Sequence, residues 1–180
     1  VTPAGVEKGR LRARDLLAVD ASGRCRTGRP TSEWPLHRAL YRQRPDAGAI
    51  CHAHPPWATA MAVAGRELDG TLLTETQTLL PRVPLVPRLA PGSEALAAAV
   101  ATAAADGDAV LLRDHGAVAV GADPAAALRC LQTVERLAQV TLLSELAASA
   151  DPPLPEVLAA LSAGLAADAV WRKPQPEAPE

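Results

Sequence analysis

Two histidines separated by one residue, His52 and His54, have the spacing in this sequence that most directly suggests chemistry. The stretch around them is expected to form a β-strand over residues 47–53, and side chains two residues apart leave the same face of a strand. Two neutral imidazoles directed at one point supply half of a four-coordinate zinc site. An HxH pair alone is a weak signal, so further ligands must come from elsewhere in the chain.

Two further residues complete a candidate ligand set. His115 lies in the apolar stretch LLRDHGAV, and Glu33 lies at the start of an expected helix. Taken singly, such a histidine is more often a hydrogen-bonded core residue, and such a glutamate is more often a capping partner. Taken together, His52, His54, His115 and Glu33 suit Zn²⁺ or another divalent transition metal, and a carboxylate that can leave the metal opens a catalytic position. The remaining histidine, His37, follows Glu33 by four residues on the same helix face and is either a partner of the ligands or a surface residue.

Alternating helical and strand patterns would position these residues, which predicts an α/β layered domain. Helices are expected over residues 34–43, 57–64, 71–80, 93–104, 123–147 and 156–165. Strands are expected over residues 15–20, 47–53, 83–86, 109–113 and 117–120. Thr31 or Ser32 would cap the first helix, and Ser93 would cap the fourth. A single domain over residues 1–171 is expected, followed by a flexible Pro-rich tail at 172–180.

Charge and composition narrow the classes of partner. The formal net charge of −2 gives no reason to expect nucleic acid or an anionic membrane as a partner. No apolar run approaches the roughly 20 residues that a membrane-spanning helix needs. Three widely spaced cysteines argue against a disulfide framework, and the first residues carry no signal-peptide pattern. A cytoplasmic location is therefore expected.

Five motifs, in their order and intervals, resemble the class II aldolase/adducin family, and specifically its fuculose-phosphate aldolase branch. They are TPAG at residues 2–5, TSEW at 31–34, RPDA at 44–47, HAH at 52–54, and HG at 115–116 with the long helix after it. The resemblance runs from residue 1 to about residue 149. It implies a three-layer α/β/α sandwich around a largely antiparallel central sheet. It also implies a homotetramer with active sites at subunit interfaces.

The resemblance further implies roles for particular residues. His52, His54 and His115 match the three zinc ligands, and Glu33 matches the acidic residue that binds the resting metal and acts as acid/base. Two hydroxyl residues and one glycine match positions at the substrate phosphate, namely Thr31, Ser32 and Gly5. The implied activity is that of a metal-dependent carbon–carbon lyase. Such an enzyme would cleave a fuculose-1-phosphate-like ketose by retro-aldol chemistry, through an enediolate, to dihydroxyacetone phosphate and an aldehyde.

The sequence departs from the family pattern in two places. The family normally has a further segment before Val1, with a Gly-Asn loop at the phosphate. The aldolase branch has a tyrosine proton donor where this chain has Leu73, and either Thr74 or Glu75 is a candidate replacement. A sugar-acid phosphate decarboxylase and a ribulose-phosphate 4-epimerase, which typically has aspartate in place of Glu33, are therefore alternatives. A non-catalytic, adducin-like interaction module is an alternative of another class, although adducin heads lose the metal ligands that this chain keeps.

Overall fold

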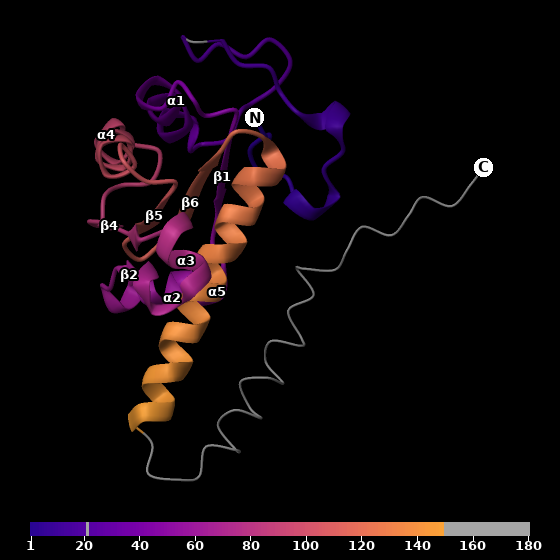
Figure 1. Cartoon of the computed structure of the whole chain (residues 1–180). Coiled ribbons are helices and arrows are strands. Elements are labelled where there is room, and N and C mark those ends of the chain that lie inside the picture. The colour runs from indigo at the N-terminus through magenta and orange to yellow at the C-terminus, as the bar shows by residue number, and fades with distance from the viewer. Residues whose placement is uncertain (21, 150–180) are drawn as a thin grey trace, which may run out of the picture. The chain divides into compact units, whose positions relative to one another are not determined.

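A four-stranded sheet forms the centre of the computed structural model, with helices on both of its faces (Figure 1). The structure describes residues 1–20 and 22–149. The strands are β1 Ala49–Ala53, β2 Leu68–Asp69, β3 Arg82–Val83, β4 Leu85–Val86, β5 Ala109–Leu112 and β6 Gly116–Gly121. The α-helices are α1 Trp34–Gln43, α2 Pro56–Ala64, α3 Thr74–Leu79, α4 Glu94–Ala103 and α5 Pro124–Ser149. The 3-10 helices are η1 Lys8–Arg10, η2 Ala13–Asp15 and η3 Gly70–Leu72.

The central sheet is largely antiparallel, as expected. Its strand order is β1-β6-β5-β4, and only the β4–β5 pair is parallel. The strands β5 and β6 form a hairpin in which Leu112 is opposite Gly116. In the β1–β6 pair, His52 is opposite Val118 and Ala53 is opposite Ala117. This register places the end of β1 beside the start of β6. A second, two-stranded sheet consists of β2 and β3.

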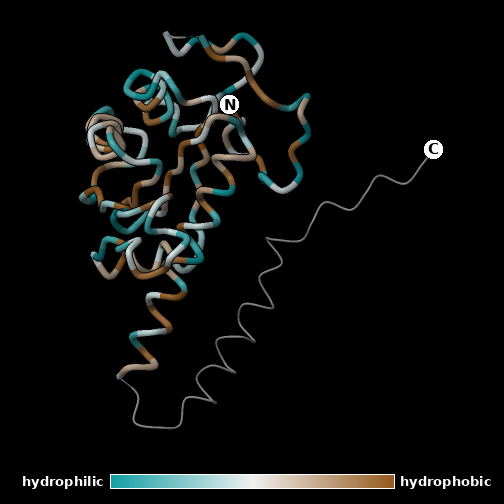
Figure 2. Tube along the Cα trace, viewed as in Figure 1, coloured by the Kyte–Doolittle hydropathy of each residue, from teal (hydrophilic) through white to brown (hydrophobic). Residues whose placement is uncertain are grey.

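Residues of β5 alternate between two hydrophobic clusters, one on each face of the sheet. Ala109 and Leu111 pack with buried residues of α2 and α5, whereas Val110 and Leu112 pack with buried residues of α1 and α4. Because successive side chains of a strand point to opposite faces, a strand covered on both sides is apolar throughout. The central strands are accordingly coloured mainly as hydrophobic (Figure 2). The expected α/β/α sandwich is therefore confirmed.

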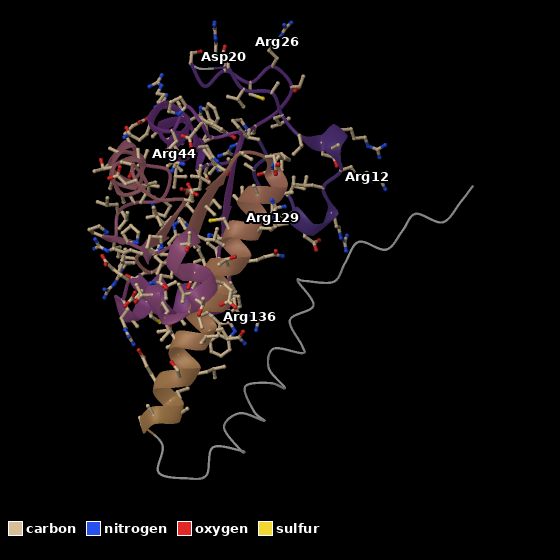
Figure 3. The ribbon with its side chains drawn as sticks, in the orientation of Figure 1. Arg12, Asp20, Arg26, Arg44, Arg129 and Arg136 are labelled. Carbon is tan, nitrogen blue, oxygen red and sulfur yellow. The ribbon has the colours of Figure 1, made fainter. Side chains whose placement is uncertain are left out.

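The run over residues 15–20 does not form the expected strand. Val19 makes an isolated bridge with Cys25, and no ladder continues from it in the described part of the chain. Leu16 is 52% exposed, so the run buries too little apolar surface to hold it against a neighbour. Asp20 instead organises a turn, because its carboxylate accepts a hydrogen bond from the backbone N–H of Ser22 at 2.9 Å. Figure 3 labels Asp20 and two exposed arginines of this N-terminal segment, Arg12 and Arg26.

Two other expected elements are each divided. The strand expected over residues 83–86 is interrupted at Pro84, which has no N–H to continue a ladder. Its two halves, β3 and β4, belong to different sheets. The helix expected over residues 71–80 is divided at Leu73 into η3 and α3, because Leu73 has extended backbone angles.

The helices α4 and α5 begin where the sequence predicts. The Ser93 hydroxyl accepts a hydrogen bond from the Leu96 N–H at 3.1 Å, which caps α4 as expected. The Asp123 carboxylate accepts one from the Ala126 N–H at 2.7 Å at the start of α5. These short polar side chains satisfy backbone donors that the first helical turn leaves free.

The chain divides into two units, residues 1–144 and residues 145–180. The sheet and the elements through most of α5 belong to the first unit, and only the last residues of α5 are described in the second. The helix expected over 156–165 and the tail expected over 172–180 lie outside the described residues. The expectation of one domain over residues 1–171 therefore stays a prediction. Within the described part, no helix is long and apolar enough to cross a membrane.

Candidate metal centre

Three histidine side chains converge beside the junction of β1 and β6. One ring nitrogen from each of His52, His54 and His115 lies within 4.8 Å of those of the other two. The ring centroids are 5.1 Å apart for His52 and His54, 5.0 Å for His52 and His115, and 4.8 Å for His54 and His115. The sequence placed these residues together from spacing and resemblance, and the structure does bring them together. Clustered imidazole nitrogens of this kind suit a divalent transition metal.

His52 is held in one tautomer by the neighbouring strand. Its Nδ1 lies 3.0 Å from the backbone carbonyl oxygen of Ala117. A carbonyl oxygen can only accept, so Nδ1 carries the proton and donates, and Nε2 keeps a free lone pair. This Nε2 is buried and has no hydrogen-bond partner. Burial also lowers the pKa of the His52 imidazole to about 4, which keeps the ring neutral near pH 7.

His54 directly follows β1 and packs against the backbone of Gly116. A Cβ atom at Gly116 would lie 2.5 Å from the Ala53 carbonyl oxygen and 2.7 Å from Cδ2 of His54. Glycine is therefore required there by the close approach of the two strands. The His54 side chain is more exposed than that of His52, and burial is still the main cause that lowers its pKa.

His115 occupies the last position of the three-residue turn that joins β5 to β6. The turn is closed by a hydrogen bond from the His115 N–H to the Leu112 carbonyl oxygen at 3.0 Å. Within it, Asp114 has φ of 58°, a left-handed conformation that Asp and Asn tolerate better than most residues. The tight hairpin thus directs His115 towards the two histidines at the end of β1.

Glu33 is buried at the start of α1 but lies outside the group of three close-set histidines. It is the N-cap residue of α1, so the expectation that Thr31 or Ser32 would occupy that position is wrong. The side chain is 8% exposed, and its Oε2 has no hydrogen-bond partner. Its charge opposes the lowering of the His54 pKa, of which burial is the main cause. Glu33 is therefore a buried carboxylate that is not part of the histidine cluster.

The unpaired atoms test whether these residues fit a metal ion. A buried polar atom without a partner costs free energy, and an ion that accepts its lone pair removes that cost. Both Nε2 of His52 and Oε2 of Glu33 are in this state. Three imidazoles and one carboxylate also match the donor types that zinc prefers. The residues present therefore fit a divalent metal.

The residues expected at the substrate phosphate lie in two segments that are hydrogen-bonded to each other. The Thr31 N–H donates to the Thr2 carbonyl oxygen at 3.0 Å, and a β-bridge joins Pro3 to Pro30. Gly5 has φ of 70°, and both Gly5 and Ser32 are exposed. Backbone pairing thus brings together two segments that are separated in the sequence. They precede α1, whose N-terminus favours anions.

Sequence reasoning missed the groups that hold the histidines in place. The Ala117 carbonyl gives no signal in a sequence, because every residue carries such an acceptor. The sequence predicts that His37 is either a partner of the ligands or a surface residue. In the structure His37 is partly buried, and burial lowers its pKa to about 4. A separate depression lined by Arg44, Arg82 and Asp108 contains none of the candidate residues.

Comparison with known proteins gives consistent matches along most of the chain. The family model described as Class II Aldolase and Adducin N-terminal domain matches residues 1–142. The L-fuculose phosphate aldolase of Methanocaldococcus jannaschii is 34% identical over 144 residues, which cover 80% of this chain and 78% of that protein. The 3-oxo-tetronate 4-phosphate decarboxylase of Escherichia coli O6:H1 is 33% identical over 147 residues, covering 79% of this chain and 69% of that protein.

A solved structure gives the same result for the fold. The L-fuculose-1-phosphate aldolase from Thermus thermophilus superposes with a TM-score of 0.76 and is 36% identical. The match covers 85% of this chain and 80% of that one. The histidine cluster and the buried Glu33 all lie within the matched family domain.

Proposed function

Because this chain belongs to the class II aldolase and adducin family, we propose that it is a zinc-dependent lyase acting on a phosphorylated ketose. In this proposal, retro-aldol cleavage of a fuculose-1-phosphate-like substrate gives dihydroxyacetone phosphate and an aldehyde. One observation carries the proposal. Three ring nitrogens lie within 4.8 Å of one another, and both His52 Nε2 and Glu33 Oε2 are buried without a hydrogen-bond partner.

The metal would be held by His52, His54 and His115, with Glu33 as an exchangeable fourth ligand. When bound, it would supply Lewis-acid stabilisation of the negative charge that develops on the substrate carbonyl oxygen. Neutral imidazoles leave the ion's positive charge available for this task. The lowered pKa of His52 supports a neutral ring at this position.

Glu33 is proposed to carry the proton of the reaction. Retro-aldol cleavage removes one proton from the hydroxyl group at the breaking bond and adds one proton to the carbon that the bond leaves behind. One acid/base group can perform both transfers if it reaches both atoms. Glu33 is buried, its Oε2 has no hydrogen-bond partner, and its charge acts on the pKa of His54, which supports this role.

The substrate phosphate is proposed to bind at Gly5, Thr31 and Ser32. Backbone hydrogen bonds join the two segments that carry these residues, and the second segment leads into α1. Free N–H groups and the helix dipole favour an anion at such a position. Charge-neutral hydroxyl and backbone donors would orient the phosphate without competing for the metal.

We further propose that the protein works as a homotetramer with active sites at subunit interfaces. Two leucines of the segment between α2 and β3 support this, because Leu72 is 49% exposed and Leu79 is 66% exposed. Exposed apolar side chains of this kind are commonly covered by a partner. Light scattering on the purified protein tests the assembly, and a monomer at micromolar concentration would contradict it.

A decarboxylase acting on a sugar-acid phosphate is the second candidate. It is favoured by the decarboxylase relative at 33% identity and by Leu73, which occupies the place of a tyrosine proton donor in the aldolase branch. Loss of carbon dioxide and retro-aldol cleavage both leave negative charge next to a carbonyl group, so both need the same metal. The one tyrosine of the chain, Tyr41, lies on α1 and not in the segment that carries Leu73, and it is 41% exposed.

A substrate panel separates these functions. The zinc-loaded protein is incubated with several ketose 1-phosphates and with 3-oxo-tetronate 4-phosphates, and aldehyde, carbon dioxide and epimer are measured. Aldehyde release supports the aldolase, carbon dioxide release supports the decarboxylase, and a C4 epimer supports the epimerase. Glu33→Gln should keep the fold and lose about 100-fold or more in turnover, since general acid–base catalysis contributes about 10²–10⁴-fold. Zinc-loaded protein that converts none of these substrates would instead support the non-catalytic module.

A further inference from the structure

One glutamate of α5 caps the helix that starts immediately after the histidine pair. The two carboxylate oxygens of Glu135 accept hydrogen bonds from the backbone N–H groups of Trp57 at 3.0 Å and Ala58 at 2.8 Å. These groups belong to the first turn of α2. The two residues are separated from Glu135 by 78 and 77 positions in the sequence, so these hydrogen bonds are a tertiary contact between α5 and α2.

This single side chain satisfies the free donors at the start of α2. The first four N–H groups of a helix have no partner within it. Pro56 has no N–H, and the Thr59 N–H donates to the Pro55 carbonyl oxygen at 2.9 Å. The remaining two donors, on Trp57 and Ala58, both bind Glu135.

The connection from this cap to His54 is short and stiff. Only Pro55 and Pro56 lie between His54 and the first capped N–H. Proline fixes φ near −65°, so these two residues transmit the position of the helix start to the residue before them. Pro55 is also buried, which limits its movement further.

Glu135 itself stands on an anchored part of α5. Its neighbours Val134 and Leu137 are fully buried and belong to the same hydrophobic cluster as Ala58 and Met61 of α2. The two helices cover the same face of the sheet (Figure 1). The cap therefore ties the start of α2 to a rigid neighbour.

We propose that Glu135 is a positioning residue for His54, acting through the start of α2. The proposal rests on the metal site proposed above. His54 lies just beyond the end of β1, so it lacks the two supports that hold His52, namely the β1–β6 ladder and the Ala117 carbonyl. On one side His54 contacts Gly116, and on the other side its chain runs directly into the capped helix. Without the cap, His54 loses the second support and the metal loses a well-placed ligand.

Zinc affinity separates positioning from simple stabilisation. Three variants are compared with the wild type: Glu135→Gln, Glu135→Ala and the control Ser93→Ala. Ser93 caps α4, on the opposite face of the sheet, so its loss destabilises the protein without touching the histidines. Each protein is studied by chelator competition for zinc, by the visible spectrum of its cobalt form, and by thermal unfolding without metal.

The expected result is a graded loss of affinity. Glu135→Ala should raise the zinc Kd about tenfold or more, the low end of the effect of removing groups that orient metal ligands. Glu135→Gln keeps one acceptor oxygen but faces the second N–H with its own NH₂, so it should fall between the wild type and Glu135→Ala. Ser93→Ala should lower the melting temperature and keep the wild-type Kd. The cobalt spectrum should change in the Glu135 variants alone.

Two other results would contradict the proposal in distinguishable ways. If the wild type binds zinc and both Glu135 variants bind it within twofold, Glu135 only stabilises the fold and the positioning role is wrong. If the wild type itself binds no zinc, the proposed metal site fails and the positioning role fails with it. If Glu135→Ala does not fold, Glu135→Gln decides between these results.

Discussion

Replacing Gly116 by alanine should damage both the fold and the candidate metal site. The added Cβ would lie 2.5 Å from the Ala53 carbonyl oxygen, 2.7 Å from Cδ2 of His54 and 3.2 Å from Cα of His54. Favourable separations between non-bonded carbon atoms are about 3.5–4.0 Å. Two of the three contacts are with backbone atoms, which cannot rotate away. The strand β1 and His54 must therefore move together.

The size of the effect follows from these overlaps. Forcing an extra methyl group into a packed site costs about 1–3 kcal/mol in the free energy of unfolding. A displacement of His54 by more than about 0.5 Å exceeds what a well-formed metal site tolerates. Zinc affinity should therefore fall about tenfold or more in Gly116→Ala, which compares with the loss expected when ligand-orienting groups are removed.

Urea unfolding of the metal-free protein and chelator competition for zinc measure these two effects. Gly107→Ala is the matched control, because a Cβ at Gly107 meets no atom within 4 Å and its φ is not positive. It should leave zinc affinity unchanged and should raise stability slightly, by about 0.4–1 kcal/mol. If Gly116→Ala matches Gly107→Ala in both assays, the close approach of Gly116 to His54 has no energetic importance.

Three further outcomes are expected. The unfolded chain takes up a proton at His52 below pH ~6.5 that the folded metal-free protein, with a pKa of about 4, does not. The free energy of unfolding, measured by urea titration, should therefore fall by ~3 kcal/mol as the pH is lowered from about 6.5 to about 4. His52→Gln should show a smaller fall over the same pH range. Arg44→Ala should cost about 1–3 kcal/mol in urea unfolding, because it removes hydrogen bonds to Asp46 and Asp108; unchanged stability would contradict this. Asp114→Val should lower the melting temperature while Asp114→Gly should not, since only the β-branched residue resists φ of 58°.

The sequence predicted the histidine cluster because its signals are local. The HxH spacing and the HG motif each place a ring next to a strand, and the β1–β6 register brings those strands together. The groups that support the rings could not be predicted from the sequence. The Ala117 carbonyl is one of many identical acceptors, and Glu135 reaches a helix start 77 residues away. Such partners become visible only when the tertiary structure is known.

Long periodic elements were also predictable, whereas short ones depended on their neighbours. The helices α4 and α5 start where capping residues and apolar spacing indicate. The helix α1 starts at Trp34 as its apolar spacing indicates, although its N-cap is Glu33 and neither Thr31 nor Ser32. The run over residues 15–20 has a strand-like composition, but among the described residues it makes a single bridge, at Val19. Pro84 divides an expected strand between two sheets. Strand formation depends on an available partner, which composition alone does not reveal.

The metal content of the purified protein tests the central claim most directly. Wild-type protein expressed with zinc supplied should carry about one zinc ion per chain, as expected for a single site built from three histidines and a carboxylate. His52→Ala and His115→Ala should each remove it while circular dichroism keeps its shape. Wild-type protein without a transition metal, or variants that retain the full complement of zinc, would contradict the account.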